Sequence, residues 1–191
     1  MTYSAQTVEI KKGPGSILIP SSQFQVTLAP YHSADHMNPK FAALVESLEP
    51  TFQRLIQMEP VSADRLPRSM PARGIYLFSD RGRHLYVGRS NNIRRRIGLH
   101  CRAGSQHNQA TFAFRMARHE TGRTEAAYTV SGSRGELVKD AVFGPVFIDS
   151  KARIRSLDLR FVEECDPTRQ ALLEIYAATV LETPFNDFEN H

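Results

Sequence analysis

Two tyrosines, an arginine and a histidine stand at spacings that could bring four polar groups to one place. Tyr76 and Tyr86 are ten residues apart, with turn-forming residues between them. An even separation around a tight turn can put both rings on one face of neighbouring strands. Arg96 and His100 follow at positions i and i+4, so on a helix they share a face. Four polar or phenolic groups could thus converge on one site.

The same four residues also have ordinary structural explanations. Tyrosines on strands are usually half-buried packing residues. An arginine four residues before a histidine is a common arrangement on helices. Taken alone, the pattern leaves both interpretations open.

A single carboxylate on an apolar stretch is a further candidate. Glu174 is the only charged residue between Gln170 and Leu181. A lone carboxylate on so apolar a helix is costly to bury unless it is paired or bound to a metal. Exposure to solvent, or an ion pair with an arginine, would equally explain it.

Arginines are concentrated in the middle of the chain. Between Arg73 and Arg123 there are eleven arginines and no lysine, opposed only by Asp80 and Glu120, which gives this segment a net charge of +9. The whole chain carries only +4, so the remainder is net acidic. This one-sided distribution indicates a polyanionic partner such as nucleic acid.

Strands, turns and helices are expected around these residues. The β-prone runs 74–78 and 85–88 flank the turn-forming residues 80–83 and predict a hairpin. Asn91 or Asn92 is placed to cap a helix from Ile93 to about Cys101. Further helices are expected over 109–119 and from Asp166-Pro167 to about Leu181. A weaker helix is expected over 135–148, with an interruption at Pro145. Further strands are expected over 126–130 and 157–162.

The first third of the chain has a different character. Residues 1–36 lack sustained periodicity and are expected to be a flexible extension, or to precede a natural start at Met37. From Pro39 to Glu59 apolar residues recur at helical spacing, which predicts one N-terminal helix. Three prolines between Pro60 and Pro71 predict a linker, so the predicted divisions are 1–36, 37–69 and 70–191.

Several protein classes are disfavoured by composition. No apolar stretch approaches the roughly 20 residues that span a bilayer. The start of the chain lacks the basic and apolar regions of a secretory signal, which predicts a cytoplasmic protein. Cys101 and Cys165 lie far apart and show no zinc-binding spacing.

The motifs together resemble the GIY-YIG nuclease superfamily, as a stand-alone catalytic domain. Gly74-Ile75-Tyr76 is followed by Tyr86-Val87-Gly88, then by Arg96 and His100 at the spacing of the family pattern. Glu174 resembles the family's metal-binding glutamate on a late helix, and Asn186 the asparagine that closes the domain. The resemblance covers residues 70–191 and implies an α+β fold, with a short, mainly antiparallel sheet flanked by helices.

The resemblance also implies roles for the site residues. Glu174 would hold one Mg²⁺ ion, with Mn²⁺ as the alternative, and Arg96 would bind a phosphate oxygen. Tyr76 would serve as the base, His100 would orient Tyr76 or the water, and Tyr86 would bind the phosphate or the water. Contacts with the substrate are expected at Arg89, Arg94, Arg95, Arg102 and His107. Structural roles are expected for Gly74, Gly88 and Asn186.

The function implied by the family is a metal-dependent endonuclease that hydrolyses phosphodiester bonds by a one-metal mechanism. DNA is the expected partner, a small-molecule cofactor and a membrane are not expected, and the N-terminal helix leaves a homodimer open. The alternatives are a catalytically silent nucleic-acid-binding module on the same fold, and a small RNA-binding or structural protein. The presence of all five expected catalytic residues, Glu174 included, favours the enzyme.

Overall fold

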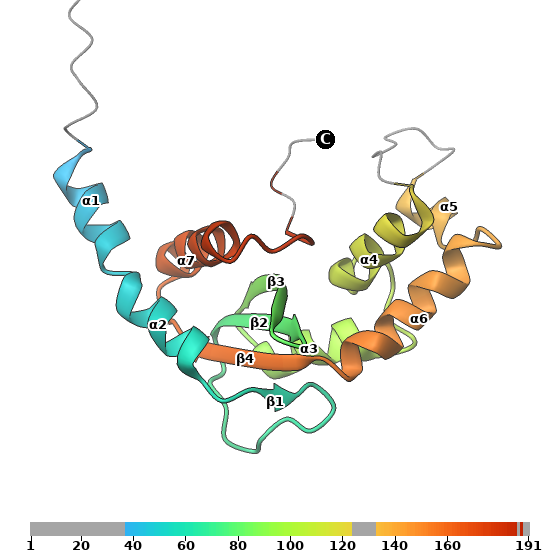
Figure 1. The fold of residues 1–191 in the computed structure, drawn as a ribbon, viewed down its shortest axis with the longest axis horizontal. Coiled ribbons are helices and arrows are strands. Elements are labelled where there is room, and N and C mark those ends of the chain that lie inside the picture. The colour runs from blue at the N-terminus through green and yellow to red at the C-terminus, as the bar shows by residue number, and fades with distance from the viewer. Residues whose placement is uncertain (1–36, 124–132, 187, 189–191) are drawn as a thin grey trace, which may run out of the picture. The chain divides into compact units, whose positions relative to one another are not determined.

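The computed structural model describes residues 37–123, 133–186 and 188, and its elements from α1 to α7 belong to one compact unit (Figure 1). The helices are α1 (Pro39–Glu46), α2 (Glu49–Gln57), α3 (Ile93–Cys101), α4 (Thr111–Thr121), α5 (Arg134–Leu137), α6 (Phe143–Arg155) and α7 (Pro167–Val180). The strands are β1 (Val61–Ser62), β2 (Gly74–Asp80), β3 (Arg83–Ser90) and β4 (Asp158–Glu163). The predicted α+β class is confirmed, with helical residues preceding the first strand.

The four strands form one antiparallel sheet in the order β1-β4-β2-β3. β2 lies between β4 and β3. The two residues that connect β2 to β3, Arg81 and Gly82, both have positive φ angles of 49° and 82°. A two-residue loop with this conformation matches the right-handed twist of the strands, which explains the tight hairpin.

The sheet buries an apolar cluster on each face. On one face, Tyr76, Phe78 and Tyr86 pack with apolar residues of α3, α4 and α6. On the other face, Ile75, Leu77 and Val87 pack with residues of α2 and α7. The alternation of side chains along β2 and β3 therefore assigns the two tyrosines to the side covered by α3 and α4.

The predicted single helix from Pro39 to Glu59 is wrong, because the structure has two helices. α1 ends at Glu46 and α2 begins at Glu49 with Pro50 in its first turn. A proline has no backbone N–H, and its ring clashes with the carbonyl group four residues earlier, which here belongs to Glu46. The apolar spacing continues across the break, so periodicity alone did not reveal it.

The predicted interruption at Pro145 is also wrong. Pro145 lies in the first turn of α6, which then continues to Arg155, whereas the chain leaves helical structure before Phe143. A proline is tolerated in a first turn because the N–H group there has no partner within the helix. The expected strand over 126–130 and the extension over 1–36 lie outside the described residues, and the expected linker contains the short strand β1.

Candidate active site

The hairpin brings the two tyrosines together, as their spacing predicts. Tyr76 pairs with Gly88 and Phe78 pairs with Tyr86, so Tyr76 and Tyr86 are diagonal neighbours on one face. Their ring centroids are 6.4 Å apart, and both side chains are buried. A Cβ atom at Gly88 would lie 2.3 Å from the Tyr76 hydroxyl oxygen. Glycine at position 88 therefore leaves the space in which the phenol group lies.

His100 binds the hydroxyl group of Tyr76. The His100 Nε2 atom lies 2.9 Å from the Tyr76 oxygen, and the imidazole is fully buried between aromatic rings. Burial lowers the pKa of His100 well below its usual value, and the charge of Arg96 lowers it further. Burial also raises the pKa of Tyr76 well above 10, with Tyr86 adding to this effect and Arg96 opposing it. Both groups of this hydrogen-bonded pair are therefore neutral at pH 7.

Arg96 is held in a fixed orientation beside Tyr76. Its Nε–H donates to the Tyr76 oxygen at 3.3 Å, and its two terminal nitrogens donate to the Gln109 carbonyl at 2.9 Å and to Thr111 Oγ1 at 3.0 Å. These bonds use three of the five guanidinium N–H groups. Burial lowers the pKa of Arg96, but its interactions with Tyr76 and then Tyr86 raise that pKa overall.

Tyr86 is fixed by stacking. Its ring lies parallel to that of Phe112, at a centroid distance of 4.7 Å and an interplanar angle of 8°. The ring of His100 meets Tyr86 edge-on at 5.6 Å. These two ring contacts restrict the Tyr86 side chain, whose phenol group interacts with Arg96.

Glu174 reaches the same region from the other face of the sheet. It lies in the middle of α7, which packs on β2 and β3, and its carboxylate accepts a hydrogen bond from Arg89 Nε at 2.9 Å. Burial raises the pKa of Glu174, while Arg89, Arg115 and Arg96 oppose this shift in that order. Glu174 in turn contributes to the raised pKa of Tyr76. Of the other expected catalytic residues, Tyr76 and Arg96 are therefore the two that interact electrostatically with Glu174.

The remaining expected contact residues are distributed differently. The side chain of Arg94 donates to the main-chain oxygens of Pro67 and Arg68, so it fastens the segment before β2 to α3. Arg95 and Arg102 are exposed at the two ends of α3. The ring of His107 packs near Phe114, with 6.3 Å between the centroids. Of the five expected contact residues, Arg89 is the one with a recorded side-chain hydrogen bond to an expected catalytic residue within the described chain.

Gly74 and Asn186 have clear structural surroundings. Gly74 has a φ angle of 144°, and a Cβ atom there would lie 2.0 Å from the Val162 carbonyl oxygen. The carboxamide of Asn186 accepts from the Val87 N–H and donates to the Val87 carbonyl, both at 2.8 Å. The Phe185 N–H donates to the Leu85 carbonyl at 3.2 Å, so the segment after α7 covers the outer edge of β3.

Three residues of the site were not predicted individually. Gln109 and Thr111 hold Arg96, and Arg115 lies close to Glu174 while donating to the Phe185 carbonyl at 2.7 Å. Thr111 and Arg115 are four residues apart on α4, so they share a helix face. That spacing is the signal from which they could have been found.

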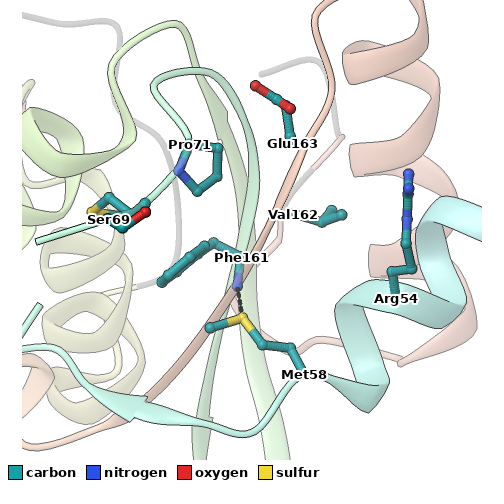
Figure 2. A pocket seen from close by; sticks show the side chains of 8 residues that line it. Arg54, Met58, Ser69, Pro71, Phe161, Val162 and Glu163 are labelled. Carbon is teal, nitrogen blue, oxygen red and sulfur yellow. Dashed lines mark hydrogen bonds between the residues drawn. The ribbon is translucent and has the colours of Figure 1, made fainter. Parts of the chain in front are cut away.

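A cavity of about 550 Å³ lies elsewhere, between α2, the segment before β2 and the end of β4 (Figure 2). Among its lining residues the Phe161 N–H donates to the thioether sulfur of Met58 at 3.2 Å, and Arg54 and Glu163 also line it (Figure 2). None of the five expected catalytic residues lines it. The site therefore does not coincide with this cavity.

The family comparison agrees with the arrangement of these residues. The family model for the GIY-YIG catalytic domain matches residues 72–183, which include both tyrosines, Arg96, His100 and Glu174. Comparisons with curated proteins and with solved structures find no match. No helix within the described residues is long and apolar enough to cross a membrane. The match covers more than half of the chain, and this protein belongs to the GIY-YIG nuclease superfamily.

Proposed function

We propose that the protein is a Mg²⁺-dependent endonuclease that hydrolyses phosphodiester bonds in DNA, with Tyr76 as the base. The observation that carries this proposal is the position of the Tyr76 hydroxyl between His100 Nε2 and Arg96 Nε. Hydrolysis forms a bond from phosphorus to a water oxygen and breaks the bond to a sugar oxygen, so the attacking water must lose a proton. A phenol that is bonded both to a proton acceptor and to a cation is suited to take it.

The proton path follows from the neutral state of the pair. Tyr76 is protonated and His100 is unprotonated, so the imidazole can accept the Tyr76 proton while the phenol oxygen takes one from water. Arg96 stabilises the negative charge that develops on this oxygen. Once the bond to the sugar oxygen has broken, that oxygen takes a proton from solvent. Burial makes the imidazolium unfavourable, so His100 then returns its proton to the Tyr76 oxygen, and the phenol releases to solvent the proton that it took from water.

Arg96 and Tyr86 are suited to the phosphate. The guanidinium has two N–H groups beyond the bonds to Tyr76, Gln109 and Thr111, and it also interacts with the Tyr86 hydroxyl group. A phosphate that replaces this interaction would meet the guanidinium and the phenol together. Its fixed orientation lowers the entropic cost of holding the phosphate in line with the water.

Glu174 fits Mg²⁺ as a single protein ligand. The described residues contain no group of three or more His, Cys, Asp and Glu side chains placed to hold a metal, as a closed metal site would require. Mg²⁺ keeps several of its waters and is often held by one or two carboxylates together with substrate phosphates. When bound, this ion would neutralise phosphate charge and lower the pKa of a coordinated water.

Substitution of Glu174 by glutamine tests the function. Glu174→Gln keeps the size of the side chain but removes the carboxylate, and the loss of metal chemistry is worth several kcal/mol of barrier. Nicking of supercoiled plasmid in Mg²⁺ should fall by orders of magnitude, with branched DNA and RNA as parallel substrates. Gel-shift affinity in EDTA should hold or rise, because one negative charge has left the site.

The wild-type protein in EDTA and a circular-dichroism comparison are the controls. A folded Glu174→Gln protein that still cuts at nearly the wild-type rate would show that Glu174 is not the metal ligand. If the wild-type protein binds DNA but cuts none of the three substrates in Mg²⁺, the catalytically silent binding module is the better description.

A further inference from the structure

The ion pair between Arg89 and Glu174 links two groups with different expected partners. Arg89 belongs to the arginine-rich segment between Arg73 and Arg123, called the basic segment below. Phosphate is the expected ligand of that segment, whereas Glu174 is the proposed metal ligand. Their Nε and Oε2 atoms are 2.9 Å apart, and the residues are separated by 85 positions in the chain. The guanidinium of Arg89 therefore occupies the carboxylate that would bind the metal, and the carboxylate occupies the guanidinium that would bind phosphate.

The surroundings of Glu174 favour a counter-ion. Its side chain is only 21% exposed, and burial raises its pKa. A nearby cation stabilises the charged form of a partly buried carboxylate. Arg89 is the largest of the three arginine contributions that oppose the pKa shift.

The three nearby arginines differ in their ability to move. Arg96 is bonded to Tyr76, Gln109 and Thr111, and Arg115 donates to the Phe185 carbonyl. The Arg89 side chain is 48% exposed, and within the described residues its recorded bond is the one to Glu174. Arg89 can therefore turn toward solvent without disturbing the packed site.

We propose that Arg89 is a displaceable counter-ion that makes metal binding and phosphate binding assist each other. Without nucleic acid, the guanidinium occupies the Glu174 carboxylate and competes with the metal. A backbone phosphate attracts Arg89 and so releases the carboxylate for the cation. The inference rests on the proposed function, because it takes Glu174 as the metal ligand.

Thermodynamic linkage gives this arrangement two measurable consequences. Removing the Arg89 charge should tighten metal binding to the free protein. Removing the Glu174 charge should tighten DNA binding in the absence of metal, but only while Arg89 is present. Coupling between two binding events is reciprocal, so both effects must appear if the pair is the link.

The first experiment measures Mn²⁺ binding to the full-length protein without nucleic acid, from the electron paramagnetic resonance signal of the free ion. Arg89→Gln should bind Mn²⁺ about fivefold more tightly than the wild type, as expected from a partly exposed ion pair. Arg89→Lys, which keeps the charge without the planar fork, should fall between them. The matched control is Arg81→Gln at the opposite end of the hairpin, where Arg81 lies 3.9 Å from Asp80; its affinity should stay within twofold of the wild type.

The second experiment is a double-mutant cycle of Arg89→Gln and Glu174→Gln, read as DNA affinity in EDTA. Glu174→Gln should raise affinity in the wild-type background and change it by less than twofold in the Arg89→Gln background. Equal gains in both backgrounds, or equal Mn²⁺ affinities for Arg89→Gln and Arg81→Gln, would overturn the inference. If Glu174→Gln binds Mn²⁺ like the wild type, the metal assignment fails, and the cycle in EDTA still decides whether Glu174 restrains Arg89.

Discussion

At the level of single residues, burial determines the protonation state of His100. The imidazole of His100 has no exposed surface, and within the described chain its Nδ1 atom has no hydrogen-bond partner. Its recorded hydrogen bond within the described residues is the one to the Tyr76 hydroxyl group. In the proposed reaction the neutral imidazole would accept the Tyr76 proton, and no second recorded partner in that part of the chain could take it on.

The neutral state of His100 predicts how stability depends on pH. The pKa of His100 in the folded protein is well below the value of about 6.5 expected for the unfolded chain. Below pH 6.5 the unfolded chain therefore binds a proton that the folded protein does not, and stability falls by at most about 1.4 kcal/mol per pH unit from this residue. This contribution is fully present above pH 6.5 and is lost as the pH falls toward the folded pKa.

Urea unfolding between pH 7.5 and 5.0 measures this effect. On acidification, the free energy of unfolding should fall more steeply for the wild-type protein than for His100→Gln. The comparison uses these slopes, so a difference in stability between the two proteins at pH 7.5 does not affect it. Parallel curves for the two proteins would mean that His100 titrates with the same pKa in the folded and unfolded states.

Elements were predictable where local chemistry determines them. The hairpin, α3 and α7 follow from turn residues and from side-chain caps, such as Asn92 Oδ1, which accepts from the Arg95 N–H at 3.0 Å. The ends of α1 and α6 were not predicted, because the apolar spacing was given more weight than the position of each proline. The convergence of Tyr76, Arg96 and Glu174 was expected only through the family resemblance, since no local signal places α7 beside β3.

At the level of elements, Asn186 fastens the C-terminal segment to β3. Its carboxamide makes both hydrogen bonds with Val87 and accepts a third from Thr183 Oγ1 at 2.9 Å. Asn186→Ala leaves both Val87 groups without this partner and should lower the free energy of unfolding by about 2 kcal/mol. Urea unfolding measures the change.

Phe188→Ala is the control for this substitution, because Phe188 is 54% exposed and lies two residues further along the chain. Its stability should stay within about 0.5 kcal/mol of the wild type. If Asn186→Ala is equally stable, the bonds to Val87 do not hold the segment in solution.

For the molecule as a whole, the arginines of the basic segment fall into different classes. Arg94 is fastened to main-chain oxygens, and Arg96 is part of the site. Arg95 and Arg102 are exposed, and neither guanidinium has a recorded partner in the part of the chain that the structure describes. The count of charges in the sequence did not separate these classes.

This division predicts the salt dependence of DNA binding. The double substitution Arg95→Ala, Arg102→Ala should reduce the slope of log affinity against log salt by about 0.9 for each phosphate contact that it removes. Affinity should weaken similarly for unrelated DNA sequences, because backbone contacts carry no sequence information.

Arg94→Ala is the control, compared per charge removed, because it takes one positive charge from the same helix. It should leave the slope nearly unchanged and lower the unfolding midpoint instead, since the bonds to Pro67 and Arg68 are lost. A flatter slope for Arg94→Ala than for the double variant would place the path of the nucleic acid on the other side of α3.

The bonds between Asn186 and Val87 join residues 99 positions apart, which has a consequence for synthesis on the ribosome. The hairpin and α3 contain local contacts and can form early. At about 5–20 residues per second, the segment that covers β3 follows Val87 by roughly 5–20 seconds. During most of this interval the growing chain has Tyr76, Arg96 and His100 but not Glu174. We therefore expect the nascent protein to bind nucleic acid before it can cut it.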